Sequence, residues 1–313
     1  MPEVPENLKG RDLLSLHDLS PEELTAILNL ADELKEMQKK GEPHPYLQGK
    51  TLGMIFQKSS TRTRVSFEVA MYQLGGYALF LSAGDLQLGR GETIADTGRV
   101  LSRYLDGIMI RTYAQADVEE LARHAAVPVI NGLTDLTHPC QILADLQTIR
   151  EHKGRLTGLK LAYVGDGNNV CHSLLFGCAK TGMHISVASP EGYGPQQRVV
   201  ELARQDAAAT GSRVETGVDP VRAVSNADVV VTDVWASMGQ ETEQAERVKI
   251  FTPYQVNANL VRHARPGFIF LHCLPAHRGE EVTAEIIDGP RSVVWDEAEN
   301  RLHAQKAVLT LLL

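Results

Sequence analysis

Short apolar runs alternate along this chain with longer stretches of helical periodicity, and this alternation constrains the fold more than any other feature. In the first half the runs are Thr51–Phe56, Tyr77–Leu81, Ile108–Ile110 and Val127–Ile130. In the second half they are Leu159–Val164, His184–Ala188, Asp228–Thr232 and Phe268–His272. Strands that alternate with helices form βαβ units, whose strands pair in parallel. The sequence therefore predicts an α/β protein in which parallel β-sheets are flanked by helices.

The chain is long enough for two domains. It has 313 residues, and one domain usually takes roughly 100–200. The polar, glycine-containing segment Lys153–Gly158 interrupts the alternation, so we expect one domain at residues 1–152 and a second at 153–313. The helical stretch from about Asp296 to Leu313 has an apolar face that is large for a free tail. We expect it to pack back on the first domain, so that helices cross between the domains.

Composition excludes several classes of partner. The formal net charge is −8, which argues against nucleic acid or a membrane surface, because both need a broad positive field. No apolar run approaches the roughly 18 residues of a membrane span, and the first ten residues do not resemble a targeting signal. Cysteines are few and widely spaced, at Cys140, Cys171, Cys178 and Cys273. This spacing predicts neither a zinc site nor a disulfide framework and favours the reducing cytoplasm.

The segment Lys58–Arg64 is the strongest functional signal. It reads KSSTRTR and lies directly after the strand Thr51–Phe56 and before the helical stretch Val65–Leu74. Backbone N–H groups in the first turn of a helix lack internal partners and attract anions, while hydroxyls and guanidiniums add donors. A solvated helix cap would be the simpler interpretation of a lone Ser-Thr pair. Two arginines within a hydroxyl run, at the end of a parallel strand, favour a phosphate site.

Two further segments carry weaker signals when each is considered alone. Thr137–Gln141 reads THPCQ and opens a helical stretch, although a histidine at a helix start more often caps or packs. In Phe268–Pro275 an apolar strand ends in a cysteine before a proline turn. Considered alone, such a cysteine is buried and structural about as often as it is functional.

Together and in this order, Ser60–Arg64, His138–Gln141 and His272–Pro275 resemble the aspartate/ornithine carbamoyltransferase family. The resemblance covers essentially the whole chain. The segments Gly165–Asn169 and Asp233–Glu241 are similar to the ornithine branch. A relative that uses aspartate is expected to present cationic residues there, for a second carboxylate.

The resemblance implies a carbamoyl phosphate site in which Ser60–Arg64 hold the phosphate. Arg62, Arg111 and His138 would reach the phosphate or the carbamoyl carbonyl, and Gln141 and the Leu274 carbonyl would accept from the carbamoyl NH₂. Arg301 would close the site, and Gln87 would be contributed to a neighbouring subunit. The full implied set is Ser60, Thr61, Arg62, Thr63, Arg64, Gln87, Arg111, His138, Gln141, Cys273, Leu274 and Arg301.

The acceptor site implied by the resemblance contains fewer residues. Asn169 and the Met238 backbone would bind the α-carboxylate of ornithine, while Asp233 and Ser237 would bind its α-amine. Cys273 and Asp233 lie where the δ-amine should arrive. The residues with catalytic roles would be Arg62, Arg111, His138, Asp233 and Cys273.

The implied reaction moves the carbamoyl group of carbamoyl phosphate to the δ-amine of L-ornithine, giving L-citrulline and phosphate in arginine synthesis. The family resemblance implies no metal or cofactor, and a homotrimer or a multiple of trimers with sites shared between subunits. Putrescine or an acylated ornithine stays open as the acceptor, although acylation would leave Asp233 poorly matched.

Two interpretations from other functional classes are weaker. Gly165–Asn169 follows a strand as a dinucleotide-binding turn would, which would make the protein an oxidoreductase. However, Val170 replaces the third glycine of that motif and no acidic residue follows about 20 residues on. A metal-binding module could use His138, Cys140, His272 and Cys273, but this is not a zinc spacing.

Overall fold

The computed structural model describes residues 8–84, 86, 91–236 and 244–313. The chain divides into two compact units. The first unit contains Met1–Gln147 and Glu299–Leu313, and the second contains Thr148–Ala298. The first division falls within helix α5 (Pro139–Lys153) and the second within α12 (Val294–Leu312), so both helices continue from one unit into the other. The expected division after residue 152 lies at the end of α5.

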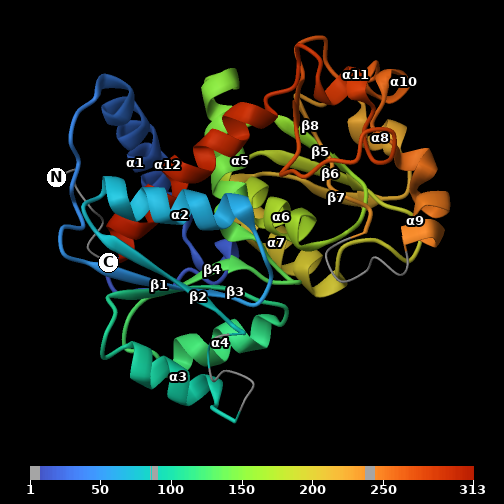
Figure 1. The fold of residues 1–313 in the computed structure, drawn as a ribbon. Coiled ribbons are helices and arrows are strands. Elements are labelled where there is room, and N and C mark those ends of the chain that lie inside the picture. The colour runs from blue at the N-terminus through green and yellow to red at the C-terminus, as the bar shows by residue number, and fades with distance from the viewer. Residues whose placement is uncertain (1–7, 85, 87–90, 237–243) are drawn as a thin grey trace. The chain divides into compact units, whose positions relative to one another are not determined.

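The first unit is built on a parallel four-stranded sheet (Figure 1). Besides its parts of α5 and α12, this unit contains the 3₁₀ turn Leu16–Asp18, α1 (Pro21–Lys40), β1 (Thr51–Phe56), α2 (Thr61–Gln73), β2 (Tyr77–Ser82), α3 (Ile94–Leu101), β3 (Gly107–Arg111), α4 (Gln115–His124) and β4 (Val129–Leu133). The strand order is β2-β1-β3-β4. Helices α3 and α4 cover one face and α2 lies on the other (Figure 1). The order reverses between β1 and β3, which is where open parallel sheets bind ligands.

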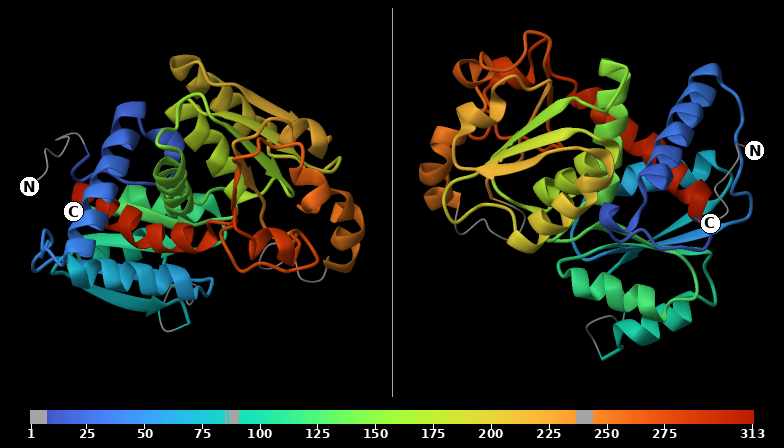
Figure 2. Two further views of the ribbon diagram at one scale, coloured as in Figure 1. Left: turned by 90° about the horizontal axis from the view of Figure 1, so that it is seen from above. Right: turned by 180° about the vertical axis from the view of Figure 1, so that it is seen from behind.

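The second unit is built on a parallel five-stranded sheet with the order β7-β6-β5-β8-β9. Its elements are β5 (Lys160–Val164), α6 (Asn169–Thr181), β6 (His184–Ala188), α7 (Gln197–Thr210), β7 (Val214–Gly217), α8 (Pro220–Val224), β8 (Val229–Val231), α9 (Gln244–Phe251), the 3₁₀ turn Thr252–Tyr254, α10 (Ala258–Val261), β9 (Ile269–Leu271) and α11 (Ala284–Ile287). Helices α6 and α7 lie on one face, and α8 and α10 lie on the other (Figure 2). The order reverses between β5 and β8, which marks a second binding position.

The predicted fold class is confirmed: two parallel sheets are flanked by helices, and two helices run through both units. Strands β1 and β6 have the predicted bounds, and the other predicted strands differ by one to three residues at their ends. Strand β7 was missed because only the first of its four residues is buried, so it shows no apolar alternation.

The start and end of α1 follow from capping chemistry. Ser20 accepts from the Glu23 backbone, and the Glu23 side chain accepts from the Ser20 backbone, which completes a capping box. Gly41 ends the helix with φ 69°, a left-handed conformation that glycine adopts without steric cost.

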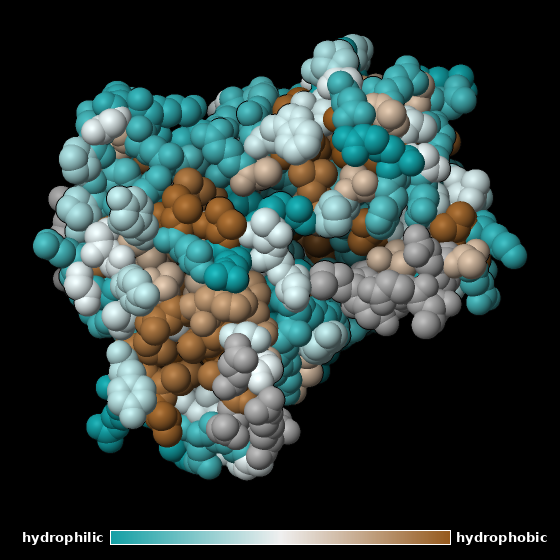
Figure 3. Space-filling model, in the orientation of Figure 1, coloured by the Kyte–Doolittle hydropathy of each residue, from teal (hydrophilic) through white to brown (hydrophobic). Residues whose placement is uncertain are grey.

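Strand β2 is an edge strand with an open apolar surface. Tyr77 is 66% exposed and Phe80 is 38% exposed, and none of its six residues is buried. Figure 3 shows apolar surface over this part of the first unit. An exposed edge strand with apolar side chains is open to pairing or packing with another chain.

No helix among the described residues combines the length and the apolar composition that crossing a bilayer requires.

Helix α12 carries a buried lysine against α1. Lys306 is fully buried, and its ammonium donates to Gln38 Oε1 at 2.6 Å and contacts His44 Nε2 at 3.0 Å. Burial lowers the pKa of Lys306 from 10.5 to about 8. The charged form is therefore disfavoured in the folded chain relative to the unfolded one.

This pKa shift predicts a pH-dependent stability. Between pH 8 and pH 10.5 the unfolded chain holds a proton that the folded chain lacks at Lys306, so the free energy of unfolding should rise with pH. The gain should reach up to about 3 kcal/mol across this window and should be absent in Lys306→Met. Urea unfolding at about pH 8 and about pH 10 measures it. Lys39→Met, which changes an exposed lysine of α1, is the control; an equal rise in Lys306→Met would contradict the assignment.

Candidate functional site

The N-terminus of α2 lies at the end of β1, beside the reversal point of the first sheet. Ser60 caps this helix, and its hydroxyl accepts from the Thr63 backbone N–H at 3.2 Å. Thr61 and Arg62 begin the first turn of this helix, at the end where helical backbone N–H groups point outward. The positive end of the helix dipole and these donors favour a phosphate at this position.

Two buried arginines from distant parts of the chain converge on Thr63. Arg111 ends β3 and its Nη1 lies 3.5 Å from Thr63 Oγ1; Arg301 belongs to α12 and its Nη2 lies 3.3 Å from the same oxygen. Both side chains are buried. Two guanidiniums that share one neutral hydroxyl repel each other, and an anion placed between them would relieve that repulsion.

His138 and Gln141 lie at the start of α5 next to these arginines. Burial, followed by the charges of Arg301, Arg111 and Arg62, holds the pKa of His138 well below its usual range. The imidazole is therefore neutral at physiological pH and can donate one hydrogen bond without adding charge. Gln141 Oε1 accepts from Arg301 Nη1 at 2.6 Å, and its Nε2 donates to Asp145 at 2.9 Å.

The structure gives Arg64 a different set of contacts. Its Nε donates to Glu68 at 3.0 Å, and its guanidinium lies 3.8 Å from the Phe80 ring centroid. Lys58 is buried, pairs with Asp135 and stacks over Tyr113. The role of Arg64 in binding phosphate stays a prediction. Gln87 lies outside the described residues.

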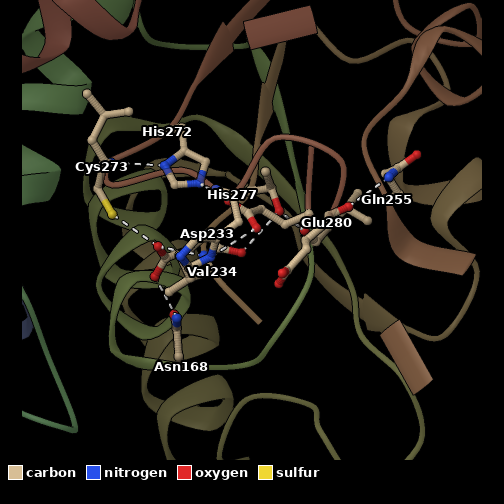
Figure 4. A network of polar contacts seen from close by, with 12 residues as sticks. Asn168, Asp233, Val234, Gln255, His272, Cys273, His277 and Glu280 are labelled. Carbon is tan, nitrogen blue, oxygen red and sulfur yellow. Dashed lines mark hydrogen bonds and ion pairs between the residues drawn. The ribbon is translucent and has the colours of Figure 1, made fainter. Parts of the chain in front are cut away.

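In the second unit, Asp233 lies just beyond β8, beside the reversal between β5 and β8. Its carboxylate accepts from Asn168 Nδ2 at 2.7 Å, from the Val234 backbone at 2.8 Å and from Cys273 Sγ at 3.1 Å (Figure 4). Asp233 itself is buried. Three donors therefore hold a carboxylate at the carboxyl ends of three strands, where it would attract a cationic ligand.

Asn168 is a site residue that sequence reasoning missed. It caps α6, and its Oδ1 accepts from the Val170 and Cys171 backbones at 3.0 and 3.2 Å. With the oxygen engaged in the cap, its amide nitrogen is directed to Asp233. The sequence signal was the helix start itself, since asparagine is a preferred cap. The predicted residue Asn169 is the first residue of α6 and is half-buried.

The 165–169 turn does not have the space of a dinucleotide site. A side chain at Gly167 would come within 2.2 Å of the Gly194 backbone, so the chain itself fills the space above this glycine. In dinucleotide-binding turns that space admits the pyrophosphate. The turn instead supports the loop after β8, because Arg247 Nη1 donates to both Asp166 at 3.1 Å and the Trp235 carbonyl at 2.8 Å. Ser237 and Met238 lie beyond Trp235, outside the described residues.

His272, Cys273 and Leu274 follow β9. The fully buried His272 ring contacts Glu281 Oε1 through Nε2 at 3.0 Å and accepts from the Leu274 backbone through Nδ1 at 2.9 Å. The His272 backbone N–H donates to Glu297 at 2.8 Å. Glu281 and Glu297 carried no sequence signal, because neither is close in sequence to the motif that it contacts.

Among the residues that the structure describes, two groups of side chains have the spacing of metal ligands. Ligand atoms of Asp233, His272 and Cys273 lie within 4.8 Å of one another, as do those of His277, Glu280 and Glu281. Both ring nitrogens of His272 are already engaged, so ligation would require it to break one of these hydrogen bonds. Cys140, from the alternative metal module, is buried with its pKa raised to about 11 by burial and donates to the Asn131 carbonyl.

Two family models match nearly the whole chain. "Aspartate/ornithine carbamoyltransferase, carbamoyl-P binding domain" matches residues 11–151. "Aspartate/ornithine carbamoyltransferase, Asp/Orn binding domain" matches residues 157–312.

Curated relatives and solved structures agree with these matches. The chain is 68% identical to the ornithine carbamoyltransferase of Carboxydothermus hydrogenoformans, over 97% of this chain and 98% of the relative. It is 63% identical to the anabolic ornithine carbamoyltransferase of Pyrococcus furiosus, over 98% of both chains. The solved structure of a Pyrococcus furiosus ornithine carbamoyltransferase superimposes with a TM-score of 0.95 at 63% identity, covering 97% of each chain.

The buried guanidiniums of Arg111 and Arg301 beside Thr63 predict phosphate binding. Arg301→Gln removes a charge and the donors to Thr63 and Gln141, so affinity for inorganic phosphate should fall about 10- to 100-fold, as expected for a charge-assisted hydrogen bond. Isothermal titration calorimetry measures the change. Arg278→Gln, at an exposed arginine paired with Asp288, is the matched control and should bind as wild type does. Equal affinity in wild type and Arg301→Gln would remove Arg301 from the site.

Proposed function

The chain belongs to the aspartate/ornithine carbamoyltransferase family, and we infer that it transfers the carbamoyl group of carbamoyl phosphate to the δ-amine of L-ornithine, giving L-citrulline and phosphate. The observation that carries the choice of acceptor is the buried Asp233 carboxylate, held by three donors. A fixed negative charge suits an amino acid with two amines and disfavours a second carboxylate.

The first domain, residues 1–152, binds carbamoyl phosphate, with Arg301 of α12 completing the set. Support comes from the capped start of α2 and from the two buried guanidiniums on Thr63. Ser60, Thr61, Thr63 and Arg64 hold the phosphate, while Arg62, Arg111 and His138 act on the carbamoyl carbonyl. Gln141 uses the remaining lone pair of its oxygen for the carbamoyl NH₂, because Arg301 takes the other.

The second domain, residues 153–313, binds ornithine. Asp233 and Cys273 receive the amines, and Asn169 binds the α-carboxylate. Ser237 and Met238 are the family's remaining ornithine contacts, and the Leu274 carbonyl accepts from the carbamoyl NH₂. The contact between Cys273 and Asp233 at 3.1 Å supports a shared role for these two groups.

The reaction is an acyl transfer. A neutral amine nitrogen bonds to the carbamoyl carbon, the bond from that carbon to the phosphate oxygen breaks, and the leaving phosphate takes the amine proton. Negative charge grows on the carbonyl oxygen, and donors aimed at that oxygen stabilise it as an oxyanion hole does. His138 contributes the N–H of a neutral imidazole, because burial and the charges of three arginines disfavour the imidazolium form. The ornithine ammonium, with a solution pKa of about 10.4, loses a proton before attack.

The enzyme works as a homotrimer, or a multiple of trimers, in the cytoplasm and in arginine synthesis. The exposed edge strand β2 supports an assembly, because its apolar side chains are open to packing with another chain. Four free cysteines suit a reducing compartment. The anabolic direction is that of the Pyrococcus furiosus relative.

A direct assay tests the function. Citrulline formation from carbamoyl phosphate and ornithine is measured with putrescine and aspartate as competing acceptors. Ornithine should be preferred by orders of magnitude, because buried polar groups matched to its α-amine and carboxylate would be left unpaired by putrescine. Faster use of putrescine would favour the alternative acceptor.

Arg62 and Arg111 should act mainly on carbamoyl phosphate. Replacing either with alanine removes a charged donor and should cost about 3 kcal/mol in kcat/KM for carbamoyl phosphate, as for one oxyanion-hole donor. Arg278→Gln serves again as the surface control. Activity within threefold of wild type in both alanine variants would contradict their role.

Asp233 should set the choice of acceptor. Asp233→Asn keeps the shape but removes the charge, so the ratio of kcat/KM for ornithine to that for putrescine should fall at least tenfold, while the KM for carbamoyl phosphate changes little. Asn169→Ala should also lower the ratio. Asp288→Asn changes an exposed aspartate and is the control. An unchanged ratio in both site variants would move specificity elsewhere in the chain.

A further inference from the structure

Glu281 is a fully buried carboxylate that lies outside every motif of the sequence analysis. Its Oε1 contacts His272 Nε2 at 3.0 Å and accepts from the His277 backbone N–H at 2.7 Å. Figure 4 shows His272 and His277 in this network. One oxygen thus holds both ends of the segment 272–277, which contains Cys273 and Leu274.

The partners of His272 specify which ring nitrogen carries the proton. Nδ1 accepts from the Leu274 backbone N–H at 2.9 Å, so it must present a lone pair. The proton then lies on Nε2 and is donated to the Glu281 carboxylate. A buried carboxylate opposite Nε2 stabilises this tautomer, and removing its charge would weaken the preference.

Leu274 needs such a restraint. Its φ is 58°, in the left-handed region that residues other than glycine rarely adopt. A residue in this conformation persists only where its surroundings hold it, and the hydrogen bond from its N–H to His272 is part of that restraint. The Leu274 conformation sets the direction of its carbonyl, and the neighbouring Cys273 thiol contacts Asp233.

We propose that Glu281 is a positioning residue for carbamoyl transfer: through the His272 tautomer and the His277 backbone, it holds the Leu274 carbonyl and the Cys273 thiol in place. This inference rests on the proposed function, in which Leu274 accepts from the carbamoyl NH₂. Glu281 itself touches neither substrate nor the reacting atoms. Its effect is geometric, and a displacement of about 1 Å in a positioning contact can lower a rate about a hundredfold.

Glu281→Gln is the main variant, because it keeps the size and an acceptor oxygen while removing the charge. It should lower kcat about tenfold and raise the KM for carbamoyl phosphate, with Glu281→Ala lowering kcat about a hundredfold. The Ki of inorganic phosphate should stay within twofold, because the proposed phosphate contacts all lie in the first unit. Glu280→Gln makes the same chemical change one residue away, at a partly buried side chain, and should match wild type.

A structural role alone gives a different result. It would reduce the folded fraction and lower apparent kcat, but would leave both KM values unchanged in assays well below the unfolding midpoint. Unchanged KM for carbamoyl phosphate, or kcat within twofold in Glu281→Gln, would overturn the proposal. If Glu281→Ala fails to fold, the Gln variant alone decides. Absence of citrulline formation by the wild-type enzyme would instead overturn the proposed function.

A second pair of variants tests the step through His272. His272→Asn can place an amide oxygen near the position of Nδ1, whereas His272→Leu has the same shape without an acceptor. We expect the kcat of His272→Asn to be at least tenfold higher than that of His272→Leu, because the asparagine oxygen can still accept from the Leu274 N–H. Equal kcat in two folded variants would overturn the route from Glu281 through His272.

Discussion

Every strand in both sheets runs parallel to its neighbours, so the carboxyl ends of each sheet lie along one edge. This constraint determines where functional side chains can gather. In the first sheet, residues after β1 and at the end of β3 meet at the reversal of strand order, where Thr63 contacts Arg111. In the second sheet, residues after β5, β8 and β9 meet in the same way at Asp233. Each unit therefore gathers polar side chains at the position that parallel topology favours.

The group of side chains around Thr63 in the first unit and the group around Asp233 in the second have opposite electrostatic character. The first concentrates buried guanidiniums in a chain whose formal net charge is −8. Burial, followed by the charges of these arginines, lowers the pKa of His138 and keeps it neutral. The second concentrates a carboxylate, a thiol and neutral donors. A doubly charged phosphate and an amino acid with two amines differ in the same sense. Local charge thus supports the proposed substrate assignment, whereas the overall acidity of the chain bears only on polyanionic partners.

Polar side chains with several partners hold the site residues of the second unit in place. Asn168 uses its oxygen to cap a helix and its nitrogen to bind Asp233, so one side chain links backbone geometry to the acceptor charge. Arg247 links the 165–169 turn to the start of the loop after β8. Glu281 restrains the ring of His272, and Glu297 restrains its backbone N–H. Such connected networks resist displacement, because moving one group would leave its partners unpaired.

The sequence by itself determined most of the alternation of strands and helices, because burial on both faces leaves a continuous apolar run in the inner strands of a parallel sheet. It also placed the hydroxyl and arginine run between a strand and a helix, where the structure has the Ser60-capped start of α2, and the anion site there stays a prediction. Strand β7 was missed because it is an exposed edge. The contact of Asn168 with Asp233 was also missed, because the family resemblance implied a role for Asn169 and none for the asparagine that caps α6. Only the tertiary structure brought Arg301 to Thr63 across 238 residues of chain and Glu281 to His272. Local pattern encodes backbone conformation, whereas such contacts depend on how whole elements pack, and no local pattern specifies that.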